Sequence, residues 1–69
     1  MKFEVYSEFD IGDIICPKSS KRIIVIVKDI ILVYSYFSYH FKYLLEFKDN
    51  RQIWINSIDI RQYELATQN

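Results

Sequence analysis

Few residues in this chain of 69 could do covalent or metal chemistry. It has one histidine, His40, and one cysteine, Cys16, which is too few for a zinc site or for a nucleophile with its base. Asp10 and Asp13 could form an acid–base pair, but they flank the only glycine, Gly12, and turn chemistry explains that placement better. We therefore predict that the protein is not an enzyme and needs no cofactor or metal.

Aromatic side chains point to binding rather than catalysis. The chain has six Tyr, five Phe and one Trp, and half of these rings lie between residues 34 and 43. A strand can bury only alternate side chains, so some of the rings should remain outside as anchors for a partner protein. The alternative is that they pack the core of the small domain, with the tyrosine hydroxyls at its rim. The candidate protein-binding residues are Trp54, Tyr34, Tyr36, Phe37 and Tyr39.

A basic segment is the second candidate site. Residues 17–28 contain four cations and no acid, whereas Glu4, Glu8, Asp10 and Asp13 make the preceding segment acidic. Cations beside exposed rings hold single-stranded RNA or DNA, so a nucleic-acid-binding module is the alternative function. A solvated strand edge would also carry such charges. The candidate nucleic-acid-binding residues are Lys18, Lys21, Arg22 and Lys28.

Length and charge limit the classes of function. Nine Lys and Arg balance nine Asp and Glu, which disfavours both a basic protein that coats duplexes and an acidic mimic of DNA. A single domain over residues 1–69 buries only about 60% of its unfolded surface, and such domains often need a metal, a disulfide or a partner chain. Because a single Cys cannot form a disulfide within the chain, a partner protein or a homodimer is the remaining source of stability. An oligomer that traps a small nucleotide-like ligand is a further alternative.

The apolar stretches are short. The most apolar one, residues 23–33, is interrupted by Lys28 and Asp29 and falls short of the roughly 20 residues that a spanning helix needs. The first residues hold no apolar run typical of a signal peptide. We expect a cytoplasmic protein that has no membrane partner.

Alternating polarity predicts a mostly β protein. In residues 39–47, rings and Leu45 alternate with polar side chains, and only Leu44 breaks the period of two. A helix over residues 34–47 is the alternative, because Ser and charged residues also recur there at helical spacing. Residues 51–56 alternate as well, with Ile53 and Ile55 on one face, so Trp54 should point outward.

Turn residues place the remaining elements. Asp49 and Asn50 tolerate the left-handed backbone of a tight hairpin, and Gly12 is expected to have a positive φ before the first strand. The pair Lys28–Asp29 marks a bend in one strand or a break between two. Other expectations are an N-terminal extension or extra strand (1–8), a loop (17–21), a strand (22–28), a helical turn capped by Ser57 (57–60), a last strand (61–65) and a frayed tail (66–69).

In chain order, FDIGDII, KRIIVIVKDI, KYLLEFKDNRQIWI and SIDI resemble the layout of small Src-homology-3-like barrels of the Tudor and KOW types. The resemblance covers residues 9–63. It implies an all-β fold, a single small five-stranded barrel with a one-turn helix before the last strand. The chain departs from the KOW pattern at Arg22, where those modules usually carry a glycine that approaches RNA. It also resembles small phage-encoded proteins, which implies a binding module that inhibits a host protein.

Overall fold

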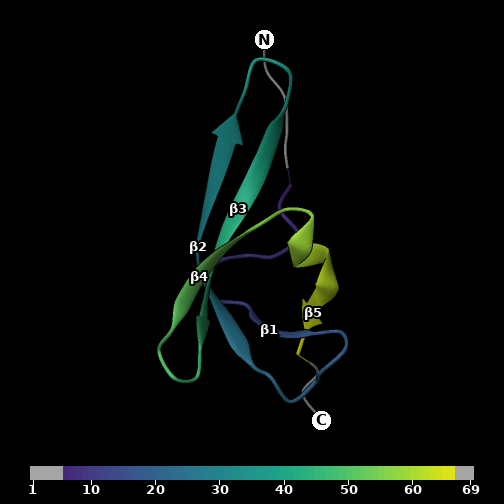
Figure 1. Ribbon diagram of the computed structural model, residues 1–69, viewed down its shortest axis with the longest axis vertical. Helices are drawn as coiled ribbons and strands as arrows, with labels where there is room; N and C mark the ends of the chain where they lie inside the picture. The colour runs from purple at the N-terminus through teal and green to yellow at the C-terminus, as the bar shows by residue number, and fades with distance from the viewer. Residues whose placement is uncertain (1–5, 67–69) are drawn as a thin grey trace.

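A computed structural model describes residues 6–66 as one antiparallel sheet. The spatial order of the strands is β4-β3-β2-β1-β5 (Figure 1). The predicted all-β class and the helical turn before the last strand are confirmed. The elements are β1 (Ile14–Pro17), β2 (Val25–Tyr34), β3 (Tyr39–Phe47), β4 (Gln52–Asn56), the 3-10 turn η1 (Asp59–Gln62) and β5 (Tyr63–Leu65). The predicted N-terminal extension and tail lie largely outside the described residues.

The sheet is not closed into a barrel, which corrects the predicted Src-homology-3-like closure. β4 pairs with β3 and β5 pairs with β1, and within residues 6–66 no ladder joins β4 to β5. Closure needs strands long enough to tilt and stagger around an axis, and β5 has only three residues. The turn η1 lies between the two end strands, contacts both, and contributes buried Ile60 to the core.

The core lies on one face of the sheet, which we call the inner face. The register sets Val27 opposite Leu45 and Ile30 opposite Tyr43 on this face. Phe9, Ile55 and Tyr63 pack against it from the periphery. The alternation predicted for residues 39–47 is therefore confirmed, and the helical alternative is wrong. The buried residues are Ile15, Cys16, Val25, Val27, Tyr43, Leu45 and Ile60.

Lys28 and Asp29 mark a bend and not a break. The register of β2 against β3 shifts between Val27 and Asp29, so Lys28 is the extra residue of a β-bulge. The Oδ1 atom of Asp29 accepts the N–H of Ile30 at 2.8 Å. Because of the extra residue, Val27 and Ile30 face the same side, and β2 runs on as one ten-residue strand, longer than the predicted 22–28.

The turns follow the sequence closely, with two corrections. Gly12 has φ +96° and Asn50 has φ +70°, as expected for their turns. The predicted cap of the helical turn is wrong, because the Oδ1 atom of Asn56 and not Ser57 accepts the N–H groups of Ile58 and Asp59, at 3.0 and 2.8 Å. Pro17, expected in a loop, ends β1 opposite Tyr63.

The hairpin of β2 and β3 projects beyond the other strands (Figure 1). We call residues 30–41 the arm, and the base comprises β1, β4, η1, β5 and the parts of β2 and β3 that pair with them. The molecule measures 43 × 24 × 20 Å and its radius of gyration is 13.0 Å. A compact domain of this length would have a radius of about 11 Å. The projecting arm accounts for the elongated shape.

Candidate functional site

Four of the five predicted protein-binding residues meet at the end of the arm. We call Tyr34, Tyr36, Phe37 and Tyr39 the aromatic tip. Tyr36 and Phe37 form the loop between β2 and β3, are 93% and 91% exposed, and pack edge to face with ring centroids 4.8 Å apart. The rings of Tyr34 and Tyr39 lie opposite each other in register, with centroids 6.4 Å apart. The tip is therefore an ordered set of rings on the surface.

Two serines hold the loop that presents these rings. The N–H of Ser35 donates to the carbonyl of Ser38 at 2.7 Å, and the N–H of Ser38 donates to Oγ of Ser35 at 3.1 Å. The hydroxyl of Ser35 also donates to the carbonyl of Ser38. Backbone groups that would otherwise need other partners at the turn are satisfied locally. Tyr36 and Phe37 are thus placed outward by a hydrogen-bonded frame.

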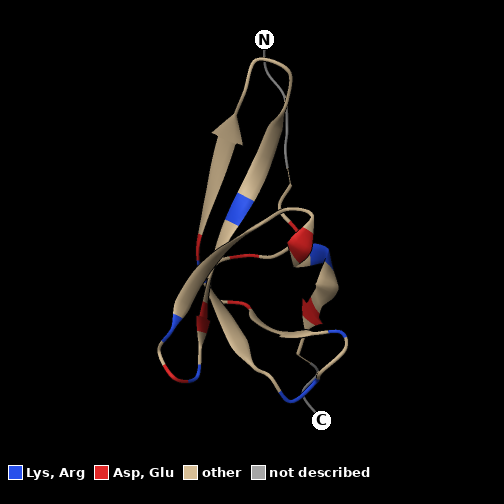
Figure 2. Cartoon of the chain, viewed as in Figure 1, with Lys and Arg blue, Asp and Glu red and all other residues tan. Residues whose placement is uncertain are grey.

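The arm carries no Lys, Arg, Asp or Glu. In Figure 2 its outer part is uniformly tan, whereas charged positions gather on the loops of the base. His40 is half-buried opposite Val33. Contacts at the tip would therefore be apolar or aromatic.

Trp54 lies apart from the tip. It is 48% exposed on β4 and sits opposite Leu44, which points away from the core. Tyr34 and Tyr39 lie on the inner face of the sheet. Tyr39 is an even number of residues from buried Tyr43 along β3, and Tyr34 is opposite Tyr39 in register. Leu44 is five residues, or about 17 Å, along β3 from Tyr39. The outward orientation predicted for Trp54 is confirmed, but Trp54 and the tip occupy different faces of the sheet.

The second face, which we call the outer face, combines apolar and charged residues. Trp54 and Leu44 lie between two polar rows of the sheet. In one row, Nε2 of Gln52 donates to Oε2 of Glu46 at 2.8 Å, and Lys28 lies 4.0 Å from the same carboxylate. In the other row, Lys42 is opposite Ile31. The apolar residues of the outer face are Ile14, Ile26, Ile31, Val33, Leu44 and Trp54.

The predicted nucleic-acid-binding residues are only partly brought together. Lys18, Lys21 and Arg22 lie in the loop between β1 and β2, and Lys21 forms an ion pair with Glu64. Lys28 stands on the bulge, up to about 20 Å of chain from Arg22, and is paired with Glu46. Two of the four cations are thus already partnered by carboxylates.

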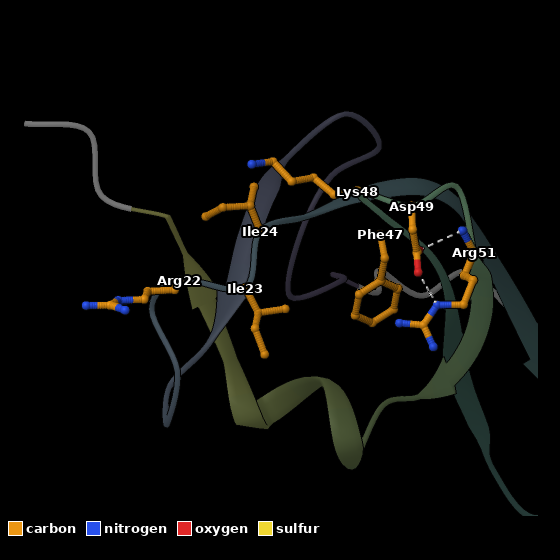
Figure 3. A pocket seen from close by; sticks show the side chains of 7 residues that line it. All are labelled: Arg22, Ile23, Ile24, Phe47, Lys48, Asp49 and Arg51. Carbon is orange, nitrogen blue, oxygen red and sulfur yellow. Dashed lines mark hydrogen bonds and ion pairs between the residues drawn. The ribbon is translucent and has the colours of Figure 1, made fainter.

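Two further cations, Lys48 and Arg51, were not predicted. They flank the β3–β4 turn, and with Arg22 they line a hollow of about 280 Å³. Its apolar side chains are Ile23, Ile24 and Phe47, and the Arg22 side chain points away from it (Figure 3). In an antiparallel hairpin the start of the first strand lies beside the end of the second, so the loop before β2 and the loop after β3 lie at the same end. This rule could have linked Arg22 with Lys48 and Arg51 from the sequence.

Asp49 fixes the position of Arg51 in that hollow. Its Oδ1 atom accepts the backbone N–H of Arg51 at 3.2 Å, and Oδ2 lies 2.7 Å from Nε of the same residue. The backbone hydrogen bond, aided by the guanidinium charge, lowers the pKa of Asp49. The guanidinium carbon of Arg51 lies 5.5 Å from the centroid of the Phe47 ring. Arg51 is therefore held by groups of its own turn.

The loop of the aromatic tip and the loops that carry Lys18, Lys21, Arg22, Lys48 and Arg51 lie at opposite ends of the molecule (Figure 2). The tip lies at the end of the arm. At the opposite end of the base lies a group of cations that we call the basic end: Lys18, Lys21, Arg22, Lys48 and Arg51. The predicted nucleic-acid site required cations beside exposed aromatic rings. The rings of the tip do not lie beside the cations.

The chemically reactive residues occupy structural positions. Cys16 is buried in β1. The Oδ2 atom of Asp13 accepts the N–H of Asp10 at 2.9 Å, so the turn role expected for this pair is confirmed. Within residues 6–66 no three His, Cys, Asp or Glu side chains are grouped as a metal site would require. Those residues also include no helix with the length and hydropathy to cross a bilayer.

Comparison with known proteins returns no similarity: no family model, no curated protein and no solved structure matches the chain.

Proposed function

We propose that the protein is a non-enzymatic binding module that captures a partner protein through its aromatic tip. The observation that carries this proposal is the almost complete exposure of Tyr36 and Phe37 at the end of a projecting arm. Rings of this kind dominate the energetics of protein interfaces. The frame of Ser35 and Ser38 lowers the ordering cost of binding, because the loop already has its conformation.

The energetics indicate the size of the contact. Burying two aromatic side chains of 150–250 Å² each contributes about 8–12 kcal/mol at 25 cal/mol per Å². Association costs an estimated 4–15 kcal/mol, so Tyr36 and Phe37 alone give little net affinity. A partner must therefore have a groove deep enough to contact Tyr34 and Tyr39 as well. Because the arm is uncharged, this binding should depend weakly on salt.

The test compares the wild-type chain with a Tyr36→Ser/Phe37→Ser double variant. Each is immobilised and exposed to the same nuclease-treated lysate, and the retained proteins are quantified by mass spectrometry. We expect a protein that the wild type retains and the double variant loses by more than tenfold, because losing two hot-spot rings typically costs at least 2 kcal/mol each.

The matched control is Ile58→Ser, which removes a 70% exposed side chain away from the arm. It should retain the same protein as the wild type. The proposal fails if all three chains retain the same proteins, or if no protein is enriched on the wild type. A purified partner then allows the loss to be measured as a dissociation constant.

The proposal also includes a relationship to the Src-homology-3-like fold and a host protein as the partner. Five strands in antiparallel succession, with a helical turn directly before the last, support an opened relative of the Src-homology-3-like arrangement. A host protein bound by a phage-type inhibitor is one form of the partner. The nucleic-acid and nucleotide-trap alternatives have less support, because the rings of the tip and the basic end are far apart.

The basic end nevertheless favours a second candidate function, binding of single-stranded RNA or DNA. Within residues 6–66, Lys21 is ion-paired with Glu64 and Arg51 with Asp49, whereas Lys18, Arg22 and Lys48 form no ion pair. Binding of a labelled oligonucleotide should weaken steeply with salt, with a slope set by the number of phosphates contacted. Absence of binding at low salt, or binding that does not respond to salt, excludes this candidate.

A further inference from the structure

Several apolar side chains of the outer face are partly exposed to water. Ile26 is 37% exposed, Ile31 is 41% exposed and Trp54 is 48% exposed, and Ile14 lies beside Ile26 in register. These side chains come from three of the five strands, β1, β2 and β4, and β4 is at the edge of the sheet. An apolar face that spans several strands is typical of an interaction surface.

The total accessible surface is larger than that of a compact domain. The chain exposes 5577 Å², whereas a compact monomer of its 8.4 kDa would expose about 4,600 Å². The excess of roughly 1,000 Å² belongs to the arm and the outer face together. One partner of a standard interface contributes about 800 Å².

The charges on the outer face select the kind of partner. Lys28 and Lys42 share this face with Asp29 and Glu46, so its charge sums to zero. A strongly acidic or basic partner would gain nothing there. A second copy fits, because a two-fold axis can set Lys42 of one chain beside Asp29 of the other.

We propose that a second copy of the chain packs on the outer face, giving a two-fold dimer of two sheets face to face. Trp54, Ile31 and Leu44 would form its apolar centre, in the manner of aligned sheet packing. Trp54 also has the features of an interface anchor, since polar rows border it on both sides. This interface does not use the aromatic tip, so the dimer would present two tips to partner proteins.

The experiment uses Trp54 as the reporter, because it is the only tryptophan. Mass in solution and Trp54 emission are followed over a dilution series of the full chain. We expect twice the chain mass at high concentration, and an emission maximum that moves to longer wavelength as dilution exposes Trp54 to water. A chain that stays monomeric at the highest concentration overturns the proposal.

Ile31→Glu tests the face directly and keeps the reporter. Position 31 lies opposite Lys42, so the new carboxylate has an opposite charge across the ladder and the monomer should still fold. We expect a dissociation constant raised at least tenfold, with far-ultraviolet circular dichroism unchanged. The control Ile58→Glu replaces an exposed isoleucine outside the strands and should leave the dimer intact.

The tip double variant separates this proposal from the proposed function. Tyr36→Ser/Phe37→Ser should dimerise as the wild type does, even though it loses the partner protein. A dimer as tight in Ile31→Glu as in the wild type overturns the outer-face interface, and so does a dimer that only the tip variant disrupts. Loss of partner capture by the tip variant would leave the proposed function standing in either case.

Discussion

The arm and the base are made from the same two long strands, yet they differ in what covers them. Within residues 6–66 all seven buried residues belong to the base, whereas no residue of the arm is buried. In the base, β1 and β4 extend the sheet on either side of the hairpin. In the arm, β2 and β3 pair with each other beyond the ends of those strands.

The arm and the base also differ in charge. Within residues 6–66 the three ion pairs all lie outside the arm, which carries no Lys, Arg, Asp or Glu. A two-stranded ribbon is marginal in water unless its side chains pack on something. The comparison indicates that stability resides in the base and that the arm is shaped for contact.

The largest expected effect is the difference between a leucine in the base and one in the arm. Leu45 is fully buried between Val27 and Ile53, so Leu45→Ala should lower the free energy of unfolding by about 2–5 kcal/mol. Leu32 is half-buried in the arm, and Leu32→Ala should cost only about 1 kcal/mol. Urea unfolding of both variants measures the difference. Equal losses would mean that the arm is packed as tightly as the base.

The sequence predicts the faces of the strands and the tight turns well because the relevant signals are local. Alternation in residues 39–47 identifies the inner face, and Ile53 and Ile55 correctly turn Trp54 outward. Gly12 and Asn50 mark the positive-φ turns by residue type alone. Each of these features depends on side chains within one strand or one turn, where period and backbone preference decide the outcome.

The open sheet and the projecting arm were not predicted, because they depend on where strands end relative to their neighbours. β1 pairs only at Ile14 and Ile15 with β2, and β4 stops opposite Lys42. No local pattern encodes those limits. The same reason explains why Lys48 and Arg51 were missed, since their role arises only when two distant loops meet at the basic end. Asn56 was not considered as the cap, although Asn is as good a capping residue as Ser.

An intermediate effect is expected at Tyr43, which marks the boundary between the two regions. It is the last fully buried residue of β3 before the arm, and its hydroxyl accepts the N–H of Glu8 at 2.9 Å. Tyr43→Phe removes that hydrogen bond and should cost about 1 kcal/mol, because the Glu8 N–H loses its partner. Chemical unfolding at neutral pH measures this cost.

The same tyrosine predicts a dependence on pH. Burial raises the pKa of Tyr43 above its ordinary value of 10.0, and the hydrogen bond from Glu8 opposes that shift. Above about pH 10 the unfolded chain loses this proton while the folded chain keeps it, so the free energy of unfolding falls as pH rises. Tyr43→Phe should make the fall shallower as the pH rises through and above about 10. An identical fall in both proteins would contradict this explanation.

The smallest effect is expected where the rings are most conspicuous. Tyr36 and Phe37 make their edge-to-face contact in water, so their burial contributes little to folding. Tyr36→Ser/Phe37→Ser should therefore change the free energy of unfolding by less than about 0.5 kcal/mol, as for most exposed positions. The measurement is a urea titration of the dilute chain, where neither a second copy nor a partner is bound. A loss above about 1 kcal/mol would mean that the tip supports the fold and would remove the main reason to regard it as a binding site. If the double variant instead unfolds with the same free energy as the wild type and no longer captures the partner, the two exposed rings serve binding, and the base provides the stability of the molecule.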